Sequence, residues 1–181
     1  MVLETKRLYL REMCPADFDC LCSIMCDEET MRAAYNSAFT GAEVQGWPER
    51  QQARYRQTSF GLWAVVCRDT QEMIGQCGLT LQSWNDHPVL EIGYLFARAH
   101  WHHGYATEAV RACVEYAFTA LNAGEVHSII RDTHIASQNV ALRCGMAVTD
   151  QCVKRFRDED MRFFLYTAKR ADGSGTDIIR R

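Results

Sequence analysis

The first sixty residues carry short amphipathic segments separated by polar breaks. Arg7 to Glu12 alternates apolar and charged side chains, with its leucines on one face, which predicts a half-exposed strand. Pro15 precedes a predicted helix from Ala16 to about Cys26, and a second helical segment follows from Met31 to Tyr35. The stretch Gly41 to Gln57 is polar and has a proline near its first turn, which predicts an exposed helix.

The rest of the chain alternates between strands and helices. Strands are predicted at 62–67, 73–81, 89–96, 126–131, 147–153 and 161–168, and helices at 104–121 and 137–144. The first two of these strands predict a hairpin, and Ser83 to Pro88 predicts a loop. Strands alternate with helices only in the second half, so the pattern favours an α/β fold with a mixed sheet, antiparallel parts and helices on both faces.

Length and charge narrow the class of protein. The 181 residues fit a single domain, which we place at residues 1–170, followed by a loose tail from Ala171 to Arg181. A hydrophobic fraction of 48% is enough for a real core. The net charge of −3 offers no basic surface for nucleic acid or an anionic membrane, and no apolar run approaches the roughly 20 residues that span a bilayer. We therefore expect a small or peptidic partner.

The nine cysteines raise the question of disulfides or a metal site, and the sequence favours neither. The N-terminus is charged and does not resemble a signal peptide, so we expect the reducing cytoplasm. No two cysteines form a CxxC pair, and most lie in apolar surroundings. This favours small buried hydrophobic residues over metal ligands.

The helix predicted to begin at Gly104 has the features of an anion site. Its apolar residues recur at the spacing of a buried stripe, from Ala106 through Val110 and Cys113 to Leu121. The first amides of any helix lack intrahelical acceptors, and glycine allows a ligand to approach the backbone. Together with the helix dipole they favour an anion such as a pyrophosphate, although a glycine at a helix start is also common as a simple turn.

Several segments together resemble the GNAT superfamily of N-acetyltransferases, in the branch of the Rim-type enzymes that acetylate ribosomal-protein N-termini. They are Leu3-Glu4-Thr5-Lys6-Arg7-Leu8-Tyr9-Leu10-Arg11, Ile74-Gly75-Gln76-Cys77-Gly78-Leu79, Glu91-Ile92-Gly93-Tyr94, Trp101-His102-His103-Gly104-Tyr105-Ala106-Thr107-Glu108-Ala109 and Ser137-Gln138-Asn139-Val140-Ala141-Leu142-Arg143-Cys144-Gly145-Met146. Each segment alone is unremarkable in specificity. Their order and spacing carry the resemblance over residues 3 to 168.

The resemblance implies a GNAT fold, whose central, mostly antiparallel sheet of about seven strands splays to form a cofactor cleft between helices on both faces. Acetyl-CoA would lie between the strand ending near Phe96 and the strand from Val126 to Arg131. In this family backbone groups of the first strand bind pantetheine, and the next loop binds the pyrophosphate. The corresponding cofactor-binding residues are Leu95, Phe96 and Ala97 on the strand, His102, His103, Gly104, Tyr105, Ala106 and Thr107 in the loop, and His134, which replaces a family asparagine.

Acetyl transfer from a thioester to an amine needs a deprotonated amine, a polarised carbonyl and a protonated leaving thiolate. Holding both substrates together supplies much of the rate, and a strand amide near Leu95 is placed to bind the carbonyl oxygen. Glu91 is the candidate general base, or it only anchors a neighbouring strand. The position of the tyrosine that many relatives use as an acid is Ala141 here. Ser137 is therefore the candidate acid, with capping of its helix as the alternative.

Three rival interpretations accompany this one. A zinc site made of His100, His102 and His103 is disfavoured because one tight turn offers no fourth ligand, so we expect no metal. The resemblance implies acetyl-CoA as the cosubstrate. Covalent transfer through Cys144 or Cys77 lacks an activating base. A GNAT-shaped module that binds CoA without catalysis stays open. The acceptor, a protein N-terminus or a small-molecule amine, and the state, monomer or homodimer, also stay open.

Overall fold

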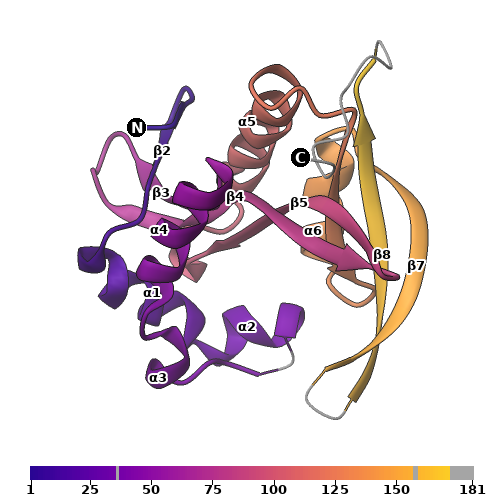
Figure 1. Ribbon diagram of the computed structural model, residues 1–181. Helices are drawn as coiled ribbons and strands as arrows, with labels where there is room; N and C mark the ends of the chain where they lie inside the picture. Colours follow the sequence, from indigo (N-terminus) through magenta and orange to yellow (C-terminus); the bar gives the residue numbers. More distant parts are fainter. Residues whose placement is uncertain (36, 157–158, 172–181) are drawn as a thin grey trace.

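One mixed sheet organises the protein. The computed structural model describes all residues except 36, 157–158 and 172–181, and within those residues the sheet has eight strands in the order β1-β2-β3-β4-β5-β6-β8-β7 (Figure 1). The strands are β1 (Leu3–Glu4), β2 (Leu8–Arg11), β3 (Leu62–Cys67), β4 (Met73–Trp84), β5 (His87–Phe96), β6 (Glu125–Arg131), β7 (Ala147–Phe156) and β8 (Glu159–Lys169). The helices are α1 (Phe18–Met25), α2 (Glu28–Tyr35), α3 (Gly41–Val44), α4 (Trp47–Thr58), α5 (Tyr105–Thr119) and α6 (Ile135–Arg143).

All neighbouring strands pair antiparallel except β5 and β6. Those two are parallel, and Glu91 opposite His127 is the register pair between them. By contrast, β4 and β5 stay in register over their whole length, from Gly75 opposite Phe96 to Trp84 opposite His87. The sheet is therefore continuous up to β5 and opens beside it. The predicted fold class is confirmed, with short β1 as a strand beyond the expected seven.

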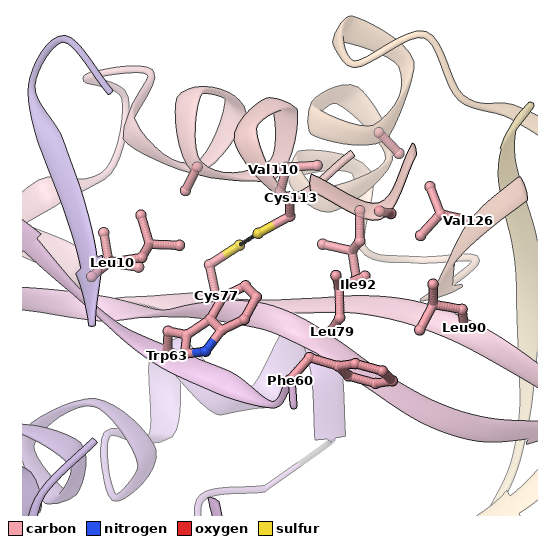
Figure 2. Close-up of a cluster of buried hydrophobic side chains, with 14 of the residues drawn as sticks. Leu10, Phe60, Trp63, Cys77, Leu79, Leu90, Ile92, Val110, Cys113 and Val126 are labelled. Atoms are coloured by element: carbon pink, nitrogen blue, oxygen red, sulfur yellow. Dashed lines mark hydrogen bonds between the residues drawn. The ribbon is translucent and has the colours of Figure 1, made fainter. Parts of the chain in front are cut away.

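Helices cover both faces of the sheet (Figure 1). On β3, Trp63 and Val65 belong to the core that packs against α5, whereas Ala64 belongs to a second core under α1, α2 and α3. This alternation is what a strand buried on both faces produces. In the first core, the thiols of Cys77 and Cys113 point toward each other across the β4–α5 interface, with sulfurs 3.6 Å apart (Figure 2). All nine cysteines are free thiols.

Two sequence expectations were wrong. The segment 41–57 is two helices, because Gly46 takes a left-handed φ of 74° between them, and it is not simply exposed. Gln51 is buried with its side-chain oxygen accepting the Leu62 amide (3.1 Å), so a polar residue serves as a core contact. The predicted loop at 83–88 is a tight hairpin turn, since Asn85 and Asp86 adopt φ of 48° and 63°.

Two further sequence expectations concern the C-terminal tail and membrane spans. The predicted tail from Ala171 to Arg181 lies, after its first residue, outside the described residues. Within the described ranges, no helix combines the length and apolarity needed to cross a membrane.

Candidate active site

The gap between β5 and β6 begins next to their register pair, where the bonds between the two strands involve side chains. The Ser128 hydroxyl donates to the Ile92 carbonyl (2.9 Å), and the Glu91 carboxylate accepts the backbone amide of Ile129. Both bonds tie the two strands together at one level. Beyond them the strands separate, which opens the cleft predicted at this point.

The alternation of the β4–β5 ladder decides which main-chain groups face that cleft. The Ala97 amide donates to the Ile74 carbonyl (3.0 Å), so this residue pairs with β4. Antiparallel strands alternate between bonded and non-bonded pairs, so Leu95 also faces β4 with its main chain. The main-chain groups of Tyr94 and Phe96 therefore point toward the cleft. The sequence predicted a carbonyl-polarising amide near Leu95. In the structure, the amides that face the cleft belong to the residues on either side of Leu95.

The turn that leads into α5 leaves its amides open. His102 and Gly104 have left-handed φ values of 62° and 79°. Within the described part of the chain, the first helical bond runs from the Glu108 amide to the Gly104 carbonyl (3.0 Å), and the amides of residues 104–107 donate to no protein group. These amides stand at the positive end of a fifteen-residue helix, which suits an anion.

A cavity of ≈ 480 Å³ lies against this turn and extends between β5 and α6. Its lining contains most of the residues expected from the sequence: Leu95, Phe96, His102, Gly104, Tyr105, Ala106, Thr107, His134 and Ser137. Among the described residues, Glu91, Ala97 and His103 fall outside that lining. The structure thus brings β5, the turn and α6 together around one space of the size that a ligand requires.

Other lining residues were not anticipated from the sequence. They are Glu29, Thr30, Tyr94, His100, Trp101, Ala136, Val140 and Arg143. Glu29 and Thr30 come from α2, which reaches the cavity because Arg98 forms ion pairs with Asp27 (3.8 Å) and Glu29. No local pattern links these segments. Arg143 lies within a segment that resembles the family, so the sequence could have identified it as a candidate residue of the site.

Ser137 is held by a tyrosine on the facing strand. The Tyr94 hydroxyl lies 2.8 Å from the Ser137 hydroxyl and donates to the carbonyl of the same residue (3.0 Å). Burial raises the pKa of the Tyr94 phenol, so it keeps its proton at neutral pH. Because the phenol has one proton and donates it to the Ser137 carbonyl, its oxygen accepts from the Ser137 hydroxyl, which Tyr94 thereby holds at the cavity wall.

Glu91 lies on the opposite face of β5 from Tyr94. Its carboxylate also approaches the Thr80 hydroxyl (3.4 Å). Burial raises the pKa of Glu91, and the amide of Ile129 and the Thr80 hydroxyl offset part of that effect. Burial and then the Glu91 charge raise the pKa of Tyr35 in α2 to about 12. Both interpretations of Glu91 keep support, because the same carboxylate anchors β6 and has the raised pKa of a base.

The histidines near the turn occupy different environments. His102 lines the cavity, whereas the His103 ring is exposed, with Nδ1 2.7 Å from the Trp101 carbonyl, and stacks on Tyr105. His134 lines the cavity at the start of α6, and burial, assisted by Arg131, lowers its pKa. His134 is therefore neutral at pH 7 and offers a donor and an acceptor. Within the described residues, no three His, Cys, Asp or Glu side chains gather as a metal site would require.

Comparisons with known proteins place this geometry in a family. The profile of the acetyltransferase (GNAT) domain matches residues 7–147. The chain is 33% identical over 144 residues to YkkB of Bacillus subtilis (strain 168), covering 80% of this chain and 84% of that protein. The fold is similar to that of a GNAT-family acetyltransferase from Bacillus anthracis, with a TM-score of 0.80 and 18% identity over 93% of this chain and 98% of that one. It is also similar to RimL, an acetyltransferase of a ribosomal protein solved with coenzyme A, with a TM-score of 0.77 and 12% identity over 93% and 97% of the two chains.

Proposed function

This chain belongs to the GNAT family of N-acetyltransferases, and we propose that it transfers the acetyl group of acetyl-CoA directly to a primary amine. The observation that carries the proposal is the set of open amides at residues 104–107, facing a cavity that runs on to Ser137. The open amides at one end of the cavity suit the pyrophosphate of acetyl-CoA. The Ser137 hydroxyl at the other end suits its thioester. The family uses acetyl-CoA, and the residues present here fit it.

The proposed binding mode follows the cavity from the turn to the splay. The amides from Gly104 to Thr107 would hold the pyrophosphate, with His102 and His134 as further donors. The cleft-facing amide of Phe96 would bind the thioester carbonyl oxygen as negative charge develops on it. Acetyl-CoA supplies the activated acetyl group, and the chain supplies position and proton transfer.

Proton transfer divides between the two faces of β5. Glu91 would accept the proton of the incoming ammonium, directly or through a water, from the face covered by α2. Ser137 would donate its proton to the leaving thiolate from the α6 face, with Tyr94 orienting its hydroxyl, and would regain a proton from water after CoA leaves. A thiolate with a solution pKa near 8.5 makes only a modest demand on that donor.

A thiol-release assay tests the proposal. We expect wild-type protein to release free thiol from acetyl-CoA only when an acceptor amine is present. The acceptors should include peptides with free N-termini in one arm and polyamines, amino sugars and drug-like amines in the other, because both classes suit the proposed chemistry. The segments proposed to decide between them are 41–57, which forms α3 and α4 rather than one helix, and the hairpin turn at 84–87.

Two controls make the outcome decisive. Calorimetry with CoA, run beside the assay, separates catalysis from binding. Uptake of CoA without thiol release in any arm would overturn the proposal in favour of a non-catalytic CoA-binding module. Failure of wild-type protein to take up CoA would contradict the proposed cofactor site itself.

A further inference from the structure

We infer that Arg7 is a positioning residue for the cofactor, which fixes the His103–Gly104 peptide so that the Gly104 amide points into the cavity. The inference rests on the proposed function. Arg7 lies in the β1–β2 turn, almost a hundred residues before the turn it would control, and within the described residues it is not part of the cavity lining. It lines instead a second cavity, shared with Gly104, Thr107 and Glu108, so it approaches the turn from a different side.

The guanidinium of Arg7 contacts the turn in several ways at once. Its Nη1 donates to the His103 carbonyl (2.8 Å), and its central carbon lies 4.6 Å from the centre of the Tyr105 ring. Its Nη2 lies 3.5 Å from the point where a side chain would begin on Gly104. One planar group thus binds His103, lies over the Tyr105 ring and stands next to Gly104 between them.

The bond to the His103 carbonyl sets the direction of the next amide. A trans peptide is planar, with its carbonyl and its N–H on opposite sides, and the structure contains no cis peptide bond among the residues described. Because the His103 carbonyl points toward Arg7, the N–H of Gly104 in the same peptide points away from it, toward the cavity. Without that bond, the peptide would be held less firmly, because Gly104 on its C-terminal side has a left-handed φ of 79° and the conformational freedom of glycine.

Glu108 holds Arg7 in that position. One carboxylate oxygen accepts the Arg7 amide (2.8 Å) and the Thr5 hydroxyl (2.6 Å), and the other accepts Arg7 Nε (2.7 Å). Glu108 lies in the first turn of α5, so the ion pair joins the β1–β2 turn to the helix whose amides bind the anion. The arrangement is a rigid fork rather than a mobile surface ion pair.

The chain offers a matched control in Arg68. It anchors the same β1–β2 turn, donating to the Thr5 carbonyl (2.9 Å) and pairing with Glu4 (2.7 Å), but it does not contact residues 102–105. Its exposure is similar, 43% against 39% for Arg7. Arg68→Gln therefore removes a cation and an anchor from the same turn and leaves the cofactor amides alone.

Calorimetry with CoA is the first test. We expect Arg7→Gln to weaken CoA binding about ten-fold, the loss of one charged hydrogen bond, and Arg68→Gln to leave it within two-fold or so. We expect Arg7→Lys to be as weak as Arg7→Gln, since an ammonium keeps the charge but not the fork. Full rescue by lysine would overturn the inference and make Arg7 a simple cation toward the phosphates. Equal losses in the Arg7 and Arg68 variants would overturn it in favour of general stability.

A shortened donor gives the second test. S-acetylpantetheine lacks the pyrophosphate, so Arg7→Gln is expected to lower kcat/KM with acetyl-CoA and to leave kcat/KM with S-acetylpantetheine unchanged. An equal loss with both donors would overturn the inference. If Arg7→Gln does not fold, Glu108→Gln weakens the same fork from its acceptor side and is expected to show the same split. Wild-type binding of CoA with no effect of either variant refutes only this inference, whereas no binding by wild type refutes the proposed function.

Discussion

The hydroxyl of Tyr94 lies 2.8 Å from the hydroxyl of Ser137, and the two side chains come from β5 and α6 on opposite walls of the cavity. The contact means that the candidate acid does not act alone. Burial raises the pKa of the Tyr94 phenol, so Tyr94 stays neutral, and its hydroxyl orients the side chain of Ser137.

Replacement of either residue should separate chemistry from binding. Ser137→Ala is expected to lower kcat about 100-fold, the usual contribution of a general acid, with little change in CoA affinity. Tyr94→Phe keeps the ring and removes only the hydroxyl, so we expect a smaller fall in kcat, about ten-fold. Steady-state kinetics with acetyl-CoA measures both. Ser137 lies inside α6, whose N-cap residue is His134, so it does not cap the helix, and a serine variant with wild-type kcat would show that Ser137 is not the acid.

Glu91→Gln distinguishes a base from an anchor. Glutamine keeps an oxygen that can accept the Ile129 amide, so the anchor survives while the base is lost. We expect kcat/KM to fall about 100-fold without a matching loss of stability. In wild type the base must be deprotonated, and burial raises the pKa of Glu91, so activity should rise with pH through a midpoint above the ordinary value of 4.5. The pH profile of the variant should lack that limb, and an unchanged limb would assign it to another group.

The sequence was informative where chemistry depends on neighbours along the chain. The stripe of α5 and the glycine before it predicted the turn, and the matched segments predicted the splay. Contacts between distant segments could not be read in this way. The alternation at Arg7 predicted only a half-exposed strand, although the side chain reaches across to His103. Nothing local to Tyr94 shows that its hydroxyl meets a serine 43 residues later.

Polar composition led to a wrong prediction of exposure where a polar side chain accepts a hydrogen bond from a buried backbone amide. Gln51 lies in a segment that is polar throughout, so exposure was the natural interpretation. The structure buries it because its oxygen accepts the Leu62 amide at the start of β3. Pro88 likewise argued for a loop, since proline removes a ladder donor, yet it is the second residue of β5 and lies opposite Ser83.

Acid should destabilise the fold through Asp17. Burial alone would raise the pKa of this carboxyl, but bonds from Arg11 (2.8 and 2.6 Å) and from the Cys14 amide (2.8 Å) outweigh it and hold the pKa below its usual 3.8. The folded protein thus binds this proton less tightly than the unfolded chain. The contribution is fully present above about pH 4 and is lost as the pH falls through the lower, folded value.

Denaturant unfolding at pH 7 and at low pH measures that contribution. Asp17→Asn is expected to cost about 2 kcal/mol at pH 7, the loss of charged hydrogen bonds, and to make stability less steep in acid. Asp160→Asn is the control, because Asp160 pairs with Arg155 at 3.7 Å and both side chains are about two-thirds exposed. It should change stability little at either pH. Equal effects of the two variants would contradict the role given to Asp17.

Gly104 and Gly145 provide the sharpest comparison for the anion site, because both have φ of 79° and only one lies in the cofactor turn. Alanine at a left-handed position costs about 1–2 kcal/mol, so both alanine variants should lose similar stability. A methyl group on Gly145 meets no atom within 4 Å, whereas on Gly104 it would lie 3.5 Å from Arg7 Nη2, the group that we infer fixes this turn. We therefore expect only Gly104→Ala to weaken CoA binding, by about ten-fold or more, in calorimetry. Equal CoA affinities in the two variants would show that the amides at the start of α5 do not carry the pyrophosphate.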